Sequence, residues 1–187
     1  MLILGTSLTA GLGVDPTEAY PAQLQRIADS SGVKLAVQAA GLSGETSAGA
    51  LRRADWLFTQ PFDVLVIESG ANDGLRGLDP DSTAANIRAI VAKARAARPR
   101  AAVMLAQMEA PTNLGAGYTR RFHALFGAVA TRDQLTLLPF FLDGIAGVDS
   151  LNQDDGIHPN PTGARRAAAN MWKALRPTLD SIAATPR

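Results

Sequence analysis

Two polar motifs, far apart along the chain, together hold the parts of a nucleophilic catalytic centre. Ser7 lies in the first, Gly5-Thr6-Ser7-Leu8, and the second, Asp155-Gly156-Ile157-His158, places an imidazole three residues after a carboxylate. A serine hydroxyl becomes a nucleophile when a nearby base takes its proton, and the carboxylate fixes the tautomer of that base. We therefore predict Ser7 as the nucleophile, His158 as the base and Asp155 as the orienting acid of an acyl-enzyme mechanism. Taken alone, Ser7 would be more typical of a turn.

Two further motifs offer neutral hydrogen-bond donors for the oxyanion that forms during acyl transfer. Residues 40–46 contain Gly41, whose backbone can approach a reacting carbonyl because it has no Cβ. Residues 70–73 contain Asn72, whose side-chain amide is a neutral N–H donor. With the backbone N–H of Ser7, Gly41 and Asn72 are predicted to form the oxyanion hole. Each could be an ordinary turn residue, and the presence of all four motifs in order favours the catalytic interpretation.

Other residues compete with His158 and Asp155 for these roles. The second histidine, His123, falls within a helical pattern and is predicted to be a packing or surface residue. Asp154 is adjacent to Asp155 but is expected to point elsewhere, and Asp149 is nine residues from the imidazole. The evidence for a metal site at Asp154, Asp155 and His158 is weak, because no further ligands occur at a matching spacing. We expect no metal and no cofactor, and the absence of cysteine excludes thiol catalysis, zinc–thiolate sites and disulfides.

The elements that must position these residues follow from alternating short apolar runs and longer helical patterns. Such alternation predicts an α/β fold, a three-layer α/β/α sandwich around a five-stranded parallel sheet. Ligands bind such sheets at the carboxyl ends of the strands, and the four motifs follow the first, second, third and fifth strands. Proline is expected to end two helices, at Pro99 and Pro177. Strands are expected at 1–4, 34–38, 64–68, 103–107 and 135–138, and helices at 17–30, 47–58, 82–97, 116–132 and 162–175.

Composition limits the class of protein. A chain of 187 residues with 47% hydrophobic residues fits a single domain, 1–187, with a substantial core. The 18 basic and 17 acidic residues give a net charge of +1 without a basic groove, so no nucleic-acid partner is expected. The basic residues on the predicted helices are interpreted as solvated faces, and Arg53 is one of them.

No apolar run approaches the roughly 20 residues of a membrane span, so stable membrane insertion is not expected. The apolar residues 2–4 run directly into the first motif and leave no room for a signal peptide. This favours either a cytoplasmic protein or the mature form of a periplasmic one. No unexplained apolar helix face is evident, so a monomer is expected.

The four motifs resemble the conserved blocks of the SGNH hydrolases, also called GDSL-type lipases and esterases. The resemblance extends to residues 70–77, 138–141 and 153–160, which are similar to the bacterial branch named thioesterase I, lysophospholipase L1 or arylesterase. It implies the flavodoxin-like SGNH fold and supports Asp155 over Asp154. The chain departs from the family at Thr6, where the first block usually carries an aspartate that supports the loops around the nucleophile. Loss of that charge is expected to affect loop order and activity level but not the identity of the nucleophile.

The expected substrate is a small ester or thioester with an acyl chain, or a lysophospholipid. The loops after the third and fourth strands are mostly apolar, and an aromatic content of only 5% argues against a surface for stacking sugars. Three alternatives stay open: a carbohydrate deacetylase, a flavodoxin-like nucleotide binder with residues 5–11 as its phosphate loop, and a non-catalytic binding module. A neutral imidazole is required for catalysis, so activity is expected to rise with pH. The predicted substrate-binding residues are Leu8, Leu75, Met108, Pro111 and Ile157.

Overall fold

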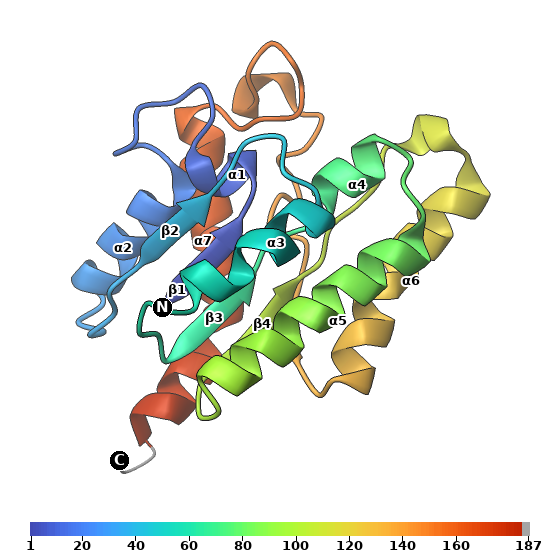
Figure 1. Cartoon of the computed structure of the whole chain (residues 1–187). Helices are drawn as coiled ribbons and strands as arrows, with labels where there is room; N and C mark the ends of the chain where they lie inside the picture. Colours follow the sequence, from blue (N-terminus) through green and yellow to red (C-terminus); the bar gives the residue numbers. More distant parts are fainter. Residues whose placement is uncertain (185–187) are drawn as a thin grey trace.

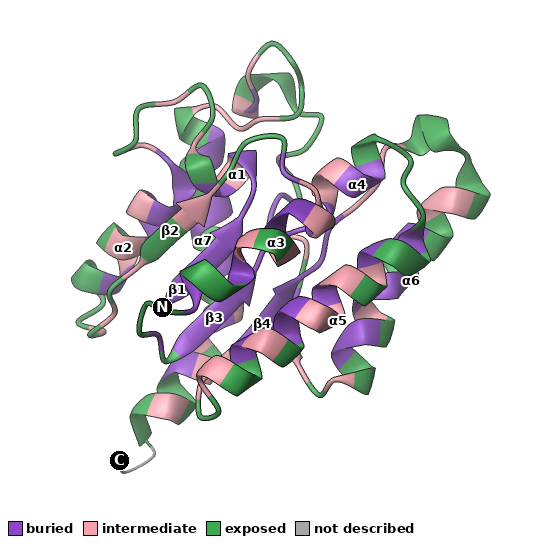
Figure 2. Ribbon diagram, in the orientation of Figure 1, coloured by how far each residue is buried: buried purple, intermediate pink, exposed green. Residues whose placement is uncertain are grey.

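A five-stranded parallel sheet forms the centre of the protein in a computed structural model that describes residues 1–184. The strand order is β2-β1-β3-β4-β5, and every neighbouring pair is parallel. All residues of β1 and β3 are buried, because helices cover both faces of the sheet (Figures 1 and 2). The three-layer α/β prediction is therefore confirmed. The strands are β1 (Leu2–Gly5), β2 (Gln38–Gly41), β3 (Val64–Ile67), β4 (Ala102–Ala106) and β5 (Thr136–Leu138).

The helices form two layers. Helix α2 (Tyr20–Ser30) packs against α7 (Pro161–Ala184) on one face, while α5 (Pro80–Ala97) packs between α3 (Ser47–Leu57) and α6 (Ala116–Arg132) on the other (Figure 1). An apolar stripe on α5 faces the core, and each of its members is at most 2% exposed. Its members are Ile87, Ile90, Val91 and Ala94. Shorter elements complete the chain: α1 (Ser7–Ala10), α4 (Ala71–Leu75), η1 (Thr112–Leu114) and η2 (Asp149–Leu151).

Strand β2 begins four residues later than the sequence pattern predicts. Leu2 pairs with Gln38, so residues 34–37 precede the start of β1 in this register. Two backbone groups of this segment form hydrogen bonds with the side chain of Gln25 on α2 instead. Gln25 donates to the Leu35 carbonyl at 2.7 Å and accepts from the Val37 N–H at 2.8 Å. A strand forms only opposite a neighbour that offers hydrogen-bond partners, so the apolar run alone could not place β2.

Helix α7 continues past Pro177, where it was predicted to end. Leu175 and Leu179, on either side of the proline, are 0% and 7% exposed and anchor successive turns in the core. Proline removes one helical hydrogen bond, and burial of Leu179 offsets that cost. Among residues 1–184, neither this helix nor any other is apolar over enough of its length to cross a bilayer.

The strand order reverses at β1, and this reversal positions the candidate site. From β1 the chain moves outward to β2 on one side and then returns to β3 on the other. In open α/β sheets a crevice forms beyond the carboxyl ends of the strands at such a point. Ser7 lies two residues beyond the end of β1, and Asn72 lies in α4, shortly after β3. The fold therefore places these two residues on opposite sides of the crevice.

Candidate active site

Ser7 is the first residue of α1, immediately beyond the carboxyl end of β1. The turn that presents it is tight, because a Cβ on Gly5 would lie 2.0 Å from the Thr9 hydroxyl. Ser7 itself is only 8% exposed. Its Oγ lies 2.8 Å from Nε2 of His158, a residue 151 positions later in the chain. The hydroxyl is thus held against an imidazole at hydrogen-bond distance, which is the contact that a nucleophile and its base require.

The imidazole of His158 is oriented by Asp155. Nδ1 of His158 lies 2.6 Å from Oδ2 of Asp155, whose Oδ1 accepts the N–H groups of His158 and Ile157, each at 2.9 Å. These bonds lower the pKa of Asp155 to about 2, and the bond from the His158 backbone N–H has the largest effect. The carboxylate therefore stays ionised near neutral pH and holds a proton on Nδ1, which leaves Nε2 to accept from Ser7. Asp155, rather than Asp154 or Asp149, is the carboxylate that meets the imidazole.

A hairpin-like loop carries the histidine to Ser7. Asn152 and Pro159 form an antiparallel bridge, and the Gln153 N–H donates to the His158 carbonyl at 2.8 Å. The side chain of Gln153 donates to the Leu12 carbonyl at 2.7 Å and so joins this loop to the segment after α1. The loop comes from the other end of the sequence but is fastened to the nucleophile region by its own side chain.

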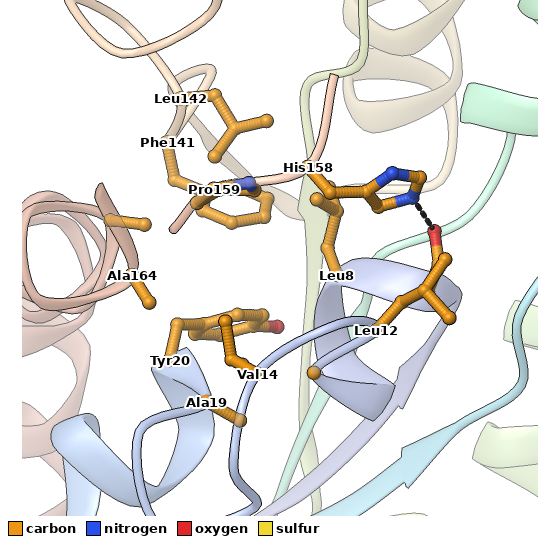
Figure 3. A pocket seen from close by; sticks show the side chains of 13 residues that line it. Leu8, Leu12, Val14, Ala19, Tyr20, Phe141, Leu142, His158, Pro159 and Ala164 are labelled. Carbon is orange, nitrogen blue, oxygen red and sulfur yellow. Dashed lines mark hydrogen bonds between the residues drawn. The ribbon is translucent and has the colours of Figure 1, made fainter. Parts of the chain in front are cut away.

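Behind His158 the wall is apolar. Figure 3 shows the imidazole at the edge of a group of hydrophobic side chains, with a dashed line for its bond to Ser7. The cavity between them measures about 20 Å³, room for about one water molecule. The imidazole is thus packed from behind and free toward the cleft in front. Side chains that line this cavity include Leu8, Leu12, Val14, Tyr20, Phe141, Leu142 and Pro159.

Gly41, predicted as an oxyanion donor, is not placed toward Ser7. It ends β2, the edge strand, where the N–H groups of Gln38 and Leu42 donate to β1 carbonyls. N–H groups of consecutive residues in a strand point to opposite sides, so the Gly41 N–H, next to that of Leu42, points away from β1. Its α-carbon packs against the backbone of Ala10, and a Cβ there would lie 2.2 Å from that nitrogen. Gly44, three residues later and with φ +75°, lines the cleft instead.

Three N–H donors belong to residues that line the cleft at Ser7. The Ser7 backbone N–H is at the first position of α1, where a helix provides no acceptor. The Gly44 N–H has no acceptor among the described residues. Asn72 Nδ2 donates one hydrogen to the Glu45 carbonyl at 3.0 Å and retains a second. Ser7, Gly44 and Asn72 line the same cleft as His158, so these free donors and the Ser7 hydroxyl share one space.

The cleft in front of Ser7 has a volume of about 660 Å³ and is mostly apolar. Its walls include all five residues predicted to bind substrate: Leu8, Leu75, Met108, Pro111 and Ile157. Glu109 is the one carboxylate among the described residues that line it. The sequence interpretation missed four apolar lining residues, Leu12, Phe140, Leu142 and Ala146. Three of them lie on loops outside the motifs, and Phe140 lies in the segment 138–141, to which the family resemblance assigned no binding role.

Comparison with known proteins agrees with this geometry. Residues 3–166 match the GDSL-like Lipase/Acylhydrolase family. The chain belongs to this family. It is 39% identical to esterase TesA of Pseudomonas aeruginosa, covering 96% of this chain and 89% of that protein. It is 38% identical to thioesterase 1/protease 1/lysophospholipase L1 of Escherichia coli K12, covering 96% and 85%. The crystal structure of a psychrotrophic esterase EstA from Pseudoalteromonas, inhibited by monoethylphosphonate, has a TM-score of 0.91, with 35% identity and 96% and 97% coverage.

These similarities make the protein a GDSL-family carboxylic ester hydrolase. Thr6, at the position where the family resemblance predicts an aspartate, contacts a buried carboxylate that directly follows β3. Glu68 is 0% exposed and accepts the Thr6 N–H at 2.9 Å, the Thr6 hydroxyl at 2.8 Å and the Thr9 hydroxyl at 2.7 Å. Burial raises the pKa of Glu68, and these three donors oppose that rise. Threonine donates to this side chain through both its N–H and its hydroxyl, so the turn that presents Ser7 is held without a charge at position 6.

Proposed function

We propose that this GDSL-family hydrolase cleaves acyl esters and thioesters through an acyl-enzyme formed on Ser7. One observation carries the proposal: an unbroken line of hydrogen bonds runs from the hydroxyl of Ser7 to the carboxylate of Asp155. The two contacts measure 2.8 Å, from Ser7 Oγ to His158 Nε2, and 2.6 Å, from His158 Nδ1 to Asp155 Oδ2. The line ends at an apolar cleft with free N–H donors, which is where an acyl group would bind.

In the first half-reaction, His158 Nε2 takes the proton of Ser7 as Oγ attacks the acyl carbonyl carbon. Negative charge develops on the carbonyl oxygen and is stabilised by the N–H groups of Ser7 and Gly44 and by the side-chain amide of Asn72. Asp155 stabilises the imidazolium that forms. When the tetrahedral intermediate collapses, the imidazolium gives its proton to the departing alcohol or thiol, and the acyl group stays on Ser7.

In the second half-reaction, water replaces the leaving group. His158 Nε2 removes a proton from that water, and the hydroxide attacks the acyl carbon within the same set of N–H donors. Collapse releases the carboxylic acid and returns the proton to Ser7 Oγ. Both half-reactions use the same groups, and no other co-reactant than water is needed for the atoms to balance.

The shape and lining of the cleft support acyl chains as substrates. Three leucine or isoleucine side chains at its walls are between 42% and 46% exposed: Leu12, Leu75 and Ile157. A bound acyl chain would cover them and remove apolar surface from water, which favours binding by roughly 25 cal/mol per Å². The relatives are themselves named esterase, thioesterase, lysophospholipase and arylesterase, in keeping with this substrate class.

The proposal is tested by hydrolysis of p-nitrophenyl esters from acetate to decanoate, with the wild type beside Ser7→Ala. We expect Ser7→Ala to lower kcat/KM by about 10⁴-fold or more, because the nucleophile acts as a unit with its base. Ser30→Ala, at the exposed end of α2, is the matched control and should match the wild type. The chain-length optimum then gives the size of the acyl site. Equal, slow rates for wild type and Ser7→Ala would contradict the proposal.

A further inference from the structure

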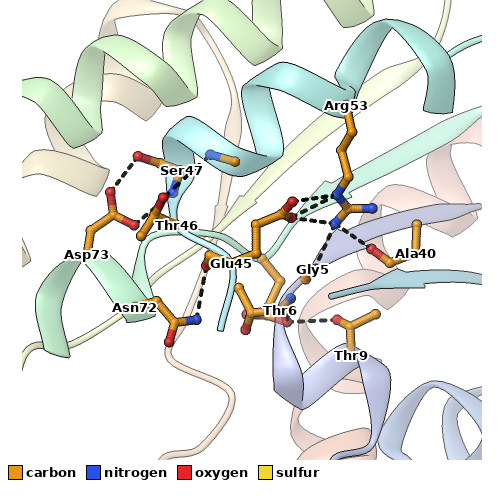
Figure 4. A network of polar contacts seen from close by, with 12 residues as sticks. Gly5, Thr6, Thr9, Ala40, Glu45, Thr46, Ser47, Arg53, Asn72 and Asp73 are labelled. Carbon is orange, nitrogen blue, oxygen red and sulfur yellow. Dashed lines mark hydrogen bonds and ion pairs between the residues drawn. The ribbon is translucent and has the colours of Figure 1, made fainter. Parts of the chain in front are cut away.

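The sequence pattern predicted that Arg53, on α3, lies on a solvated face, and that prediction is wrong. Its side chain is 20% exposed and reaches inward to the carboxyl ends of β1 and β2 (Figure 4). Nε lies 2.8 Å from each carboxylate oxygen of Glu45, and Nη2 lies 2.6 Å from Oε2. Nη2 also donates to the carbonyls of Gly5 at 3.1 Å and Ala40 at 2.9 Å. One guanidinium thus contacts three separate segments of the chain.

These three segments are the ones whose relative position decides the geometry of the site. Gly5 ends β1, two residues before Ser7, and Ala40 lies in β2. Glu45 directly follows Gly44, whose N–H points into the cleft in our proposed mechanism. Arg53 therefore joins the strand that presents the nucleophile to the loop that presents an oxyanion donor. The planar fork of arginine suits this task, since its donors are fixed relative to one another.

The oxyanion loop, residues 42–46, has no helix or strand of its own and depends on such contacts. At its far end, Asp73 accepts the Ser47 N–H at 2.8 Å and the Ser47 hydroxyl at 2.5 Å, which fastens the loop to α4. In its middle, Arg76 donates to the Gly44 carbonyl at 2.9 Å. Near β1, the loop is held by the hydrogen bond from the Leu42 N–H to the Gly5 carbonyl and by the guanidinium fork of Arg53.

The Arg53–Glu45 ion pair is well enclosed. The Glu45 side chain is 5% exposed, and its Cγ would lie 2.7 Å from a Cβ built on Gly49. The Glu45 backbone carbonyl accepts the Asn72 side chain at 3.0 Å, so a second oxyanion donor rests on the same residue. A displacement of Glu45 would therefore shift both Gly44 and Asn72 relative to Ser7.

We propose that Arg53, acting through Glu45, is a positioning residue that sets the distance between the Ser7 turn and the oxyanion donors. The inference rests on the proposed function, because it assigns a role within the same site. Donors placed for the developing oxyanion favour the transition state over the bound substrate. Loss of the Arg53 fork should therefore lower kcat and leave KM nearly unchanged.

The test compares Arg53→Met and Arg53→Lys with Arg88→Met as the matched control. Arg88 forms a half-buried ion pair with Asp133, at 3.1 Å, on the far side of α5 from the loop. The measurements are kcat and KM for p-nitrophenyl butyrate, inhibition by butylboronic acid as a tetrahedral analogue, and the thermal unfolding midpoint. Because complete loss of one oxyanion donor costs about 10²- to 10³-fold, we expect displaced donors in Arg53→Met to cost roughly 10- to 100-fold in kcat.

Boronate affinity should fall in parallel with kcat, and Arg53→Lys should recover part of both. Arg88→Met should lower the unfolding midpoint but keep kcat and boronate affinity within about twofold, as expected for a contact outside the site. A purely structural role for Arg53 would lower the midpoint without the parallel loss of kcat and affinity, and that outcome would overturn the proposal. Should Arg53→Met fail to fold, Glu45→Gln, which keeps the shape and removes the charge, is judged by the same two quantities. Wild-type turnover no faster than Ser7→Ala would instead refute the proposed function, and this assignment with it.

Discussion

Two histidines in this enzyme each hold a carboxylate at Nδ1, yet only one of them faces a nucleophile. His158 Nδ1 lies 2.6 Å from Asp155, and His123 Nδ1 lies 2.7 Å from Glu109, so the pairs are nearly equal in length. The His158 side chain is 16% exposed and its Nε2 meets the hydroxyl of Ser7. The His123 side chain, on the surface of α6, is 63% exposed.

The difference teaches that a histidine–carboxylate pair is not by itself a catalytic base. Asp155 is fixed by two backbone N–H groups of its own loop. Besides His123, Glu109 receives only the amide of Gln107, at 3.4 Å, within the part of the chain that the structure describes. The loop that carries His158 lies at the carboxyl edge of the sheet and brings the imidazole to Ser7. His123 projects from a helix whose other face is packed into the core. Surroundings, and not the pair, determine which imidazole can act on a substrate.

The largest expected effect comes from removing each imidazole in turn. His158→Ala should lower kcat/KM for p-nitrophenyl butyrate by about 10⁴-fold or more, since the serine hydroxyl then has no base. His123→Ala should stay within about twofold of the wild type, because its side chain is exposed and its partners are Glu109 and Gln107 rather than Ser7. Steady-state kinetics on the two purified variants decide the matter. A comparable loss in both would mean that the surface pair takes part in the reaction.

A smaller effect is expected when only the carboxylates are neutralised. Asp155→Asn keeps the shape of the loop but no longer favours the proton on Nδ1, so kcat should fall by roughly 10²- to 10⁴-fold. Glu109→Gln should change kcat by less than about threefold, since Glu109 lines the cleft without touching the base. Circular dichroism of both variants controls for folding. Near-normal kcat in Asp155→Asn would show that the imidazole is oriented by other groups.

Much of this arrangement was predictable because it follows from local rules. Strand–helix alternation predicts a parallel sheet, and residues that follow its strands must gather at one edge. Ser7, Asn72, Asp155 and His158 meet in the structure for that reason. The five predicted substrate-binding residues line the cleft because they lie on the loops that leave that same edge. These predictions depended on the presence of all four motifs in order, and not on any single residue.

What the sequence did not reveal depends on register and on long side chains. The direction of the Gly41 N–H is set by which residues of β2 pair with β1, and a shift of one residue reverses it. The apolar pattern does not contain this register, and for the same reason it predicted β2 too early in the chain. Arg53 occupies a helical position that a charge pattern assigns to solvent, but its side chain spans from α3 to three backbone segments. Glu68 follows an apolar run, and only the folded turn shows that two threonines donate to it.

The smallest and most graded effect concerns pH, and it distinguishes Asp155 from His158. The pKa of Asp155 is lowered to about 2, below its ordinary value of 3.8, so any stability contributed by the ionised form is present above about pH 4 and lost as the pH falls toward 2. Solvent screens that contribution, because the carboxylate side chain is 45% exposed. Above about pH 4 the Asp155 carboxylate should thus stay ionised, so loss of activity on acidification in that range should not involve its protonation. The acid limb of log kcat/KM should have a slope no steeper than one, measured with p-nitrophenyl butyrate at constant ionic strength. A limiting slope of two above pH 4 would show that Asp155 titrates together with its histidine, and that its two backbone donors do not hold it ionised.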